Sequence, residues 1–169
     1  MCIEPVPSPI PALHPVLRRH LLHLTHGSVT VRALQRNDVN DWLGLCVQRR
    51  AQHGFGCRPD ADVQLLIGVQ RSRLQFDNDQ LLLGVFDASN GRLLDQLGVR
   101  LQSTQARSAE LHPFCQALWK GTQSLRDTLH ALCPFLFEQV GLHRLYVLLP
   151  AQTPKTVASV WKDAGFEKE

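Results

Sequence analysis

The spacing of apolar and polar side chains changes several times along the chain, and each change predicts a different element. Residues 28–34 alternate apolar with polar positions, which predicts a strand. Residues 80–102 hold two apolar runs around Asn90-Gly91, a dipeptide typical of the tight turn in a β-hairpin. Residues 108–115 and 143–150 have the composition of two further strands, the second fully buried.

Helical spacing appears between these strands. It predicts helices at 37–54, with Asn37 or Asp38 as cap, at about 62–76, from Gly121 to Val140, and from Pro154 to Ala164. The third helix has a broad apolar stripe that contains Leu125, Leu129, Leu132, Leu136 and Val140.

Local signals also set the ends and the course of this third helix. Ser124 followed by Asp127 resembles a capping box, and Gly141 suits the left-handed position after a helix. Pro134 removes a helical hydrogen bond, so we expect a kink between His130 and Pro134.

The first 27 residues differ from the rest. Prolines at alternate positions in residues 1–12 predict an extended arm, and residues 13–27 contain a short helical leucine stripe. His20, His23 and His26 follow at intervals of three, and such histidines can share a metal ion. Because no neighbouring carboxylate or cysteine completes the ligand set, the polar flank of a helix is favoured and no metal site is predicted.

Composition narrows the classes of function. The chain has 169 residues, the size of one domain, with 44% hydrophobic and 20% charged residues. No apolar run is long enough for a membrane span, the N-terminus lacks signal-peptide features, and the five cysteines form no CxxC pair, so a cytoplasmic location is expected. The net charge is +3, and 14 of the 18 basic residues are arginines spread along the chain. This distribution argues against nucleic acid as the partner.

Three stretches together resemble the GNAT superfamily of acyl-CoA N-acyltransferases, most closely the branch that acetylates protein N-termini, ribosomal proteins and small amines. They are VTVRALQRNDVNDWLGL, FDASNGRLLDQLGV and FLFEQVGLHRLYVLLPAQTPKTVASVWKDAGFEKE. The resemblance covers residues 28–169 and implies an α/β (α+β) domain with a central mixed sheet flanked by helices. In this sheet residues 108–115 and 143–149 are expected to be parallel neighbours. The proline-rich arm, residues 1–27, lies outside it, and most of the family's closing hairpin is expected to be missing.

The resemblance also implies a coenzyme loop at the start of the third helix, where backbone N–H groups receive the pyrophosphate of acetyl-CoA. It falls on Lys120, Gly121, Thr122, Gln123, Ser124 and Leu125. Gln123 replaces the family's central glycine and Leu125 replaces a small residue. An ordinary helix cap remains the alternative interpretation of this stretch.

Glu110 and His112 are the candidate catalytic residues, on the strand that lies beside the coenzyme in this superfamily. They are two apart, so their side chains are expected on one face of the sheet. Such groups can deprotonate an ammonium near neutral pH, although a solvated sheet face would also carry them. Cys115 as a covalent acyl carrier is less favoured, because the resemblance implies direct transfer.

Two functions follow as alternatives. The first is acyl-CoA-dependent N-acyl transfer to an amine-bearing small molecule or a protein N-terminus. The expected acyl group is acetyl. The second is a catalytically silent GNAT fold, a pseudoenzyme that serves as a structural or binding subunit. Because strand 143–149 is apolar and lacks its closing partners, a homo-oligomer or a larger assembly is expected in either case.

Overall fold

Six strands form one sheet in the computed structural model, which describes residues 22–38, 40–45, 80–103, 107–113, 122–149, 151 and 153–168. The strands are β1 (His23–His26), β2 (Val29–Ala33), β3 (Gln80–Asp87), β4 (Leu93–Ser103), β5 (Ser108–Pro113) and β6 (Arg144–Val147), in this spatial order. Neighbours are antiparallel except β5 and β6, which are parallel. The predicted mixed sheet, including the parallel pairing of its last two strands, is confirmed.

The hairpin between β3 and β4 follows from its turn chemistry. Asp87 accepts hydrogen bonds from the backbone and hydroxyl of Ser89, at 2.8 and 2.6 Å, and from the amide of Asn90. Gly91 has φ +72°, a conformation that a side chain would strain. The predicted Asn90-Gly91 hairpin is therefore confirmed.

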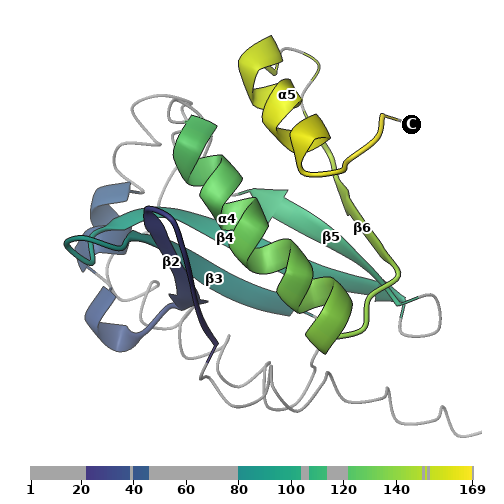
Figure 1. Cartoon of the computed structure of the whole chain (residues 1–169). Coiled ribbons are helices and arrows are strands. Elements are labelled where there is room, and N and C mark those ends of the chain that lie inside the picture. Colours follow the sequence, from purple (N-terminus) through teal and green to yellow (C-terminus); the bar gives the residue numbers. More distant parts are fainter. Residues whose placement is uncertain are drawn as a thin grey trace, which may run out of the picture.

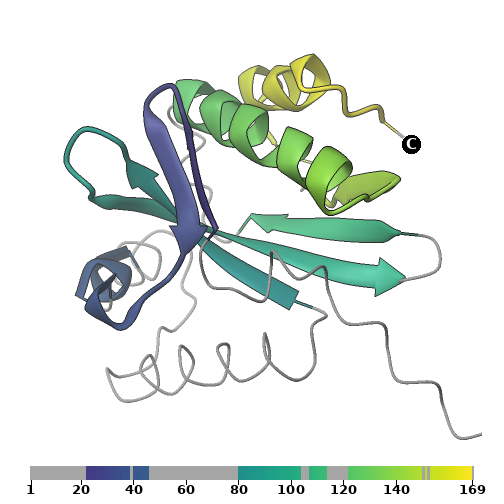
Figure 2. The same ribbon diagram turned by 60° about the horizontal axis from the view of Figure 1, so that its bottom comes forward.

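Two helices cover one face of the sheet. They are α4 (Thr122–Pro134), which continues as η3 (Phe135–Gln139), and α5 (Lys155–Asp163), and Figure 2 shows both on the same side of the strands. The leucine stripe of α4 and the inner residues Val157, Val160 and Trp161 of α5 are buried against the sheet. This cluster is the main core, and it places the start of α4 beside the strands.

The type of helix changes directly after Pro134, while the kink expected between His130 and Pro134 stays a prediction. Pro134 is the last residue of α4, and residues 135–139 then form a π-helix. In a π-helical turn an N–H bonds the carbonyl five residues before it, as the Val140 N–H bonds the Phe135 carbonyl at 3.0 Å. Gly141 follows with φ +77°, and the Leu142 N–H donates to the Leu136 carbonyl at 3.0 Å, as predicted for a glycine after a helix end.

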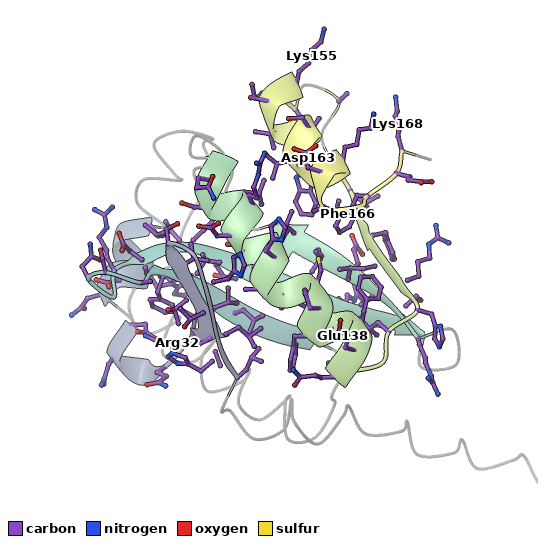
Figure 3. The ribbon with its side chains drawn as sticks, viewed as in Figure 1. Arg32, Glu138, Lys155, Asp163, Phe166 and Lys168 are labelled. Atoms are coloured by element: carbon purple, nitrogen blue, oxygen red, sulfur yellow. The ribbon has the colours of Figure 1, made fainter. Side chains whose placement is uncertain are left out.

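A smaller core lies on the opposite face of the sheet. It is formed by Leu34, Trp42, Leu45, Phe86 and Leu93. The helical residues 40–45 supply Trp42 and Leu45 to this cluster, and they follow the 3₁₀ turn η1 (Arg36–Asp38). Asp38 is buried there, and it accepts two hydrogen bonds from Arg32, at 2.7 and 2.8 Å, and one from the backbone of Gln35. Figure 3 shows Arg32 beside this segment. The remainder of the predicted helix 37–54 and the helix predicted at 62–76 lie outside the described residues.

Residues 23–26 form a strand rather than the end of the predicted helix. They pair with β2 from His23 opposite Arg32 to His26 opposite Val29, which covers an edge of β2 that would otherwise be open. His23 and His26 are an odd number of residues apart, so they lie on opposite sides of this strand. The interpretation of His23 and His26 as part of the polar flank of a helix is therefore wrong. Residues 1–21 lie outside the described residues, so the arm and the domain division at residue 27 stay predictions.

Candidate active site

The two parallel strands β5 and β6 pair over only four residues each. Ser108 to Leu111 lie opposite Arg144 to Val147, whereas His112 and Pro113 of β5 continue past the last paired residue of β6. Figure 1 shows the two strands separating toward the end of the molecule where α4 begins and α5 lies. Beyond Leu111, β5 therefore has no ladder partner on β6.

Glu110 lies in the paired part of β5, one residue before the end of the ladder. Its neighbours Ala109 and Leu111 are buried in the main core, so Glu110 faces the opposite side of the sheet. The residue is only 7% exposed. His112 has the same alternation along the strand, but its side chain lies outside the described residues. The prediction that both side chains share one face is therefore open.

Tyr146 of β6 is the residue directly paired with Glu110, and its hydroxyl donates a hydrogen bond to the Glu110 carboxylate. Burial raises the pKa of Tyr146 above its ordinary value of 10.0, and Glu110 raises it further, while Arg100 and Arg144 oppose the shift. The hydroxyl is therefore protonated at neutral pH and available as a donor. The sequence predictions did not include this pair, although the parallel strands that they placed side by side contain it.

Two properties of the first turn of α4 suit the binding of an anionic ligand. The first N–H groups of any helix lack intrahelical partners, and no acidic residue lies in the first turn of α4. Leu125 is buried in the main core, so its side chain points away from the helix end. Gln123 bends along the helix and donates to Asp127 Oδ1 at 2.7 Å. Lys120 and Gly121 lie outside the described residues, as does the side chain of Thr122.

The predicted capping box at Ser124 and Asp127 is wrong. The Asp127 carboxylate accepts hydrogen bonds from the backbone and hydroxyl of Ser28, at 2.8 and 2.7 Å, as well as from Gln123. Ser124 instead accepts a bond at its carbonyl from the Thr128 hydroxyl at 2.7 Å. These donors belong to Ser28 and to the side chain of Gln123, and none of them is a backbone N–H of the first turn of α4. Asp127 therefore connects α4 to the turn between β1 and β2.

This connection determines the backbone around it. A Cβ at Gly27 would overlap the Asp127 carboxylate, and Gly27 has φ +53°, so only glycine fits both requirements. Burial alone would raise the pKa of Asp127, but the hydrogen bonds from Ser28 and Gln123, together with the nearby His26, hold it below the ordinary 3.8. His26 also stacks on His130 of α4, with ring centroids 5.4 Å apart. The β1–β2 hairpin is thus attached to the helix beside the candidate coenzyme loop.

A covalent mechanism through cysteine finds no support in the part of the chain that is described. Burial raises the pKa of the Cys133 thiol to about 11, so this group is protonated and a poor nucleophile. Cys115 lies outside the described residues. Among the described side chains, no three histidines, cysteines or carboxylates converge on a possible metal position.

No helix in the described residues combines the length and the apolar composition needed to cross a membrane.

Solved structures resemble this chain over most of its length. A protein from Vibrio cholerae assigned as a ribosomal-protein-serine acetyltransferase matches with TM-score 0.70 and 16% identity over 86% of this chain and 83% of its own. RimJ of Mycobacterium smegmatis in complex with CoA-disulfide matches with TM-score 0.70 and 17% identity over 87% and 75%. Spermidine N-acetyltransferase of Vibrio cholerae, in complex with CoA and spermine, matches with TM-score 0.65 and 20% identity over 84% and 82%.

Comparisons based on sequence, unlike those based on structure, give no match. No family model matches the chain, and no curated protein matches it. The structural similarity therefore shows the fold, which is that of the GNAT acetyltransferases, with a mixed sheet and flanking helices.

Proposed function

We propose that this GNAT-fold chain is an acyl-CoA-dependent N-acyltransferase that acetylates a primary amine. The observation that carries the proposal is the position of Glu110, a nearly buried carboxylate one residue before the point where β5 and β6 separate. Similar structures hold CoA, and one of them holds CoA together with the amine spermine. A carboxylate beside a gap between strands is the group that such a transfer requires, because the acceptor ammonium must lose a proton before it can attack.

The residues at and near Glu110 then have distinct roles in this reaction. Glu110 takes the proton that the acceptor ammonium loses, directly or through a water molecule. The Tyr146 hydroxyl, protonated at neutral pH, donates to the Glu110 carboxylate and holds it in position. The backbone N–H of His112, the residue of β5 directly after the last one that pairs with β6, is proposed to polarise an acyl oxygen. His112 is proposed as an auxiliary base on the same strand.

Acetyl-CoA supplies the activated acyl group as a thioester, and Lys120 to Leu125 are proposed to hold it. Backbone N–H groups in the first turn of α4 suit its pyrophosphate, since the helix end is positive and carries no carboxylate there. The Gln123 side chain is held on Asp127 and so does not stand over the helix end. The Lys120 ammonium would add a second attraction for phosphate.

Binding of the coenzyme can be measured without knowledge of the acceptor. Acetyl-CoA at 100 times its dissociation constant should stabilise the fold by about 2.7 kcal/mol, which raises the melting temperature by about 5–10 °C. Lys120→Ala should reduce this shift, whereas Lys168→Ala, an equal loss of charge at an exposed position after α5, should not. A melting temperature that acetyl-CoA leaves unchanged would instead favour the silent-subunit alternative, which the structural comparisons do not support.

The free side of β6 supports a second proposal, that the protein assembles through this strand with a second copy of itself. Within the described residues β6 is the last strand of the sheet, and Leu148 just beyond it is 73% exposed. An apolar edge of this kind tends to pair with another chain.

Light scattering tests this assembly. We expect the protein to form a dimer or larger oligomer and Leu148→Lys to shift it toward a monomer, because a charge at the edge opposes pairing. Phe137→Lys places the same charge at another exposed apolar residue, on η3, and should leave the oligomer unchanged. A monomeric wild-type protein at high concentration contradicts the proposal.

A further inference from the structure

Three polar side chains on the two strands that flank β5 lie around Glu110. Arg100 of β4 lies directly opposite Glu110, and Tyr146 of β6 is its partner on the other side. Directly paired residues project from the same face of a sheet. Arg144 is two residues before Tyr146 and shares that face, with its guanidinium 6.0 Å from the centre of the tyrosine ring.

The charges in this cluster are unequal. Arg100 and Arg144 are exposed, whereas Glu110 is 7% exposed. Among the described side chains of this cluster, two are exposed guanidinium groups and one is a carboxylate that is nearly covered. Both act on the Tyr146 hydroxyl as well: burial and then Glu110 raise the pKa of Tyr146, and the two arginines oppose that rise. Within the part of the chain that the structure describes, the charge beside the proposed base is therefore mainly positive.

A positive face disfavours an acceptor that carries only positive charges. A polyamine would place its ammonium groups beside two arginines for every carboxylate. An anionic group on the acceptor would instead meet the planar fork of arginine, which binds carboxylates with two parallel hydrogen bonds. The strands of Arg100 and Arg144 each lie about 5 Å from that of Glu110, so ammonium and anion need to be separated by only a few bonds.

We propose that the acceptor amine carries an anionic group close to its ammonium, with Glu110 facing the ammonium and Arg100 and Arg144 receiving the anion. An acidic amino compound or a peptide with an acidic residue at its N-terminal end has this chemistry. The inference rests on the proposed acyl transfer for its position at the active site. It names the acceptor class, which the similarity to acetyltransferases of ribosomal protein and of spermidine leaves undecided.

Three dipeptide amides provide the test. They share an N-terminal serine and differ only in the second residue, which is aspartate, asparagine or lysine. With acetyl-CoA, we expect kcat/KM to be highest for the aspartyl compound, about fivefold above the asparaginyl one, and lowest for the lysyl compound. Spermidine, as a polyamine, should be the poorest acceptor. High salt should reduce these differences, because the arginines are exposed.

Variants separate this recognition from structural effects. Arg100→Gln and Arg144→Gln should each raise KM for the aspartyl compound about fivefold, with kcat nearly unchanged, and remove the preference over asparagine. Arg100→Glu should reverse it in favour of lysine. Arg92→Gln is the matched control, because Arg92 is an exposed arginine in the β3–β4 turn, about 25 Å along β4 from Arg100.

Two failures remain distinguishable. Equal or better use of the lysyl compound and of spermidine would overturn the acceptor assignment and leave acyl transfer intact. If no compound is acetylated, calorimetry of the aspartyl compound on the protein alone decides. Binding that weakens in Arg100→Gln and Arg144→Gln supports the anion-binding face while acyl transfer fails, and absence of binding overturns the face as well.

Discussion

Glu110→Gln is expected to lower kcat for acetyl transfer by about two to three orders of magnitude, the usual contribution of a general base. The substitution keeps the shape of the side chain and an oxygen that can accept the Tyr146 hydrogen bond. It removes only the ability to take a proton. Steady-state kinetics with the aspartyl dipeptide amide and acetyl-CoA measure the effect.

Controls for Glu110→Gln are available in the same chain. Glu138→Gln makes the same chemical change at an exposed residue of η3, which Figure 3 labels, and should retain full activity. Tyr146→Phe removes the donor but keeps the ring, so a smaller loss, about fivefold to tenfold, is expected. The melting shift caused by acetyl-CoA should be the same in all three variants. An unchanged kcat in Glu110→Gln would rule out Glu110 as the base.

The second large effect concerns stability. Asp127→Ala should lower the free energy of unfolding by about 3 kcal/mol, because it leaves the Ser28 N–H and hydroxyl and the Gln123 amide without their acceptor. For a chain of this size the melting temperature should fall by about 6–12 °C. Thermal unfolding followed by circular dichroism measures both quantities.

Asp163→Ala is the matched control for Asp127→Ala. Asp163 forms an exposed ion pair with Arg126 at 3.1 Å, and such pairs contribute about 0–1 kcal/mol. Comparable losses of unfolding free energy in the two variants would show that the hydrogen bonds of Asp127 stabilise the fold no more than this exposed ion pair does.

The stability that Asp127 contributes depends on pH, and the direction of this dependence follows from its pKa. The pKa of Asp127 is lower in the folded protein than the ordinary 3.8 that applies to the unfolded chain. The unfolded state therefore binds the proton first as the pH falls, and stability decreases. The contribution of Asp127 is complete above pH 3.8 and is lost as the pH falls through its lowered value. The difference in stability between wild type and Asp127→Ala should narrow over that acidic range.

Local patterns predicted the parts of the fold that depend on local chemistry. The Asn90-Gly91 turn, the leucine stripe of α4 and the glycine at 141 each carry their signal within a few residues. The sequence pattern did not predict the strand at 23–26, because this segment becomes a strand by pairing with the edge of β2 and not through its own composition. Tertiary pairing can impose a strand on a short segment whose own pattern favours a helix.

Contacts between residues far apart in sequence also explain why only part of the candidate site could be predicted. Glu110 was identified from its strand, but its pairing with Tyr146 depends on the register between strands 36 residues apart in sequence. Asp127 was interpreted as a cap because Ser124 lies three residues before it. Its actual partner, Ser28, is 99 residues away. No short-range pattern contains either contact.

The bond between Ser28 and Asp127 also orders events during synthesis of the chain. β2 can pair with β3 once Asp87 has emerged from the ribosome, but the turn between β1 and β2 has no helix to hold it until Asp127 follows, 40 residues later. At about 5–20 residues per second this interval lasts about 2–8 s. During that time Val29 and Val31, fully buried in the finished protein, have one face without cover. A nascent chain of this protein should therefore be a substrate for chaperones that bind apolar strands until α4 is complete.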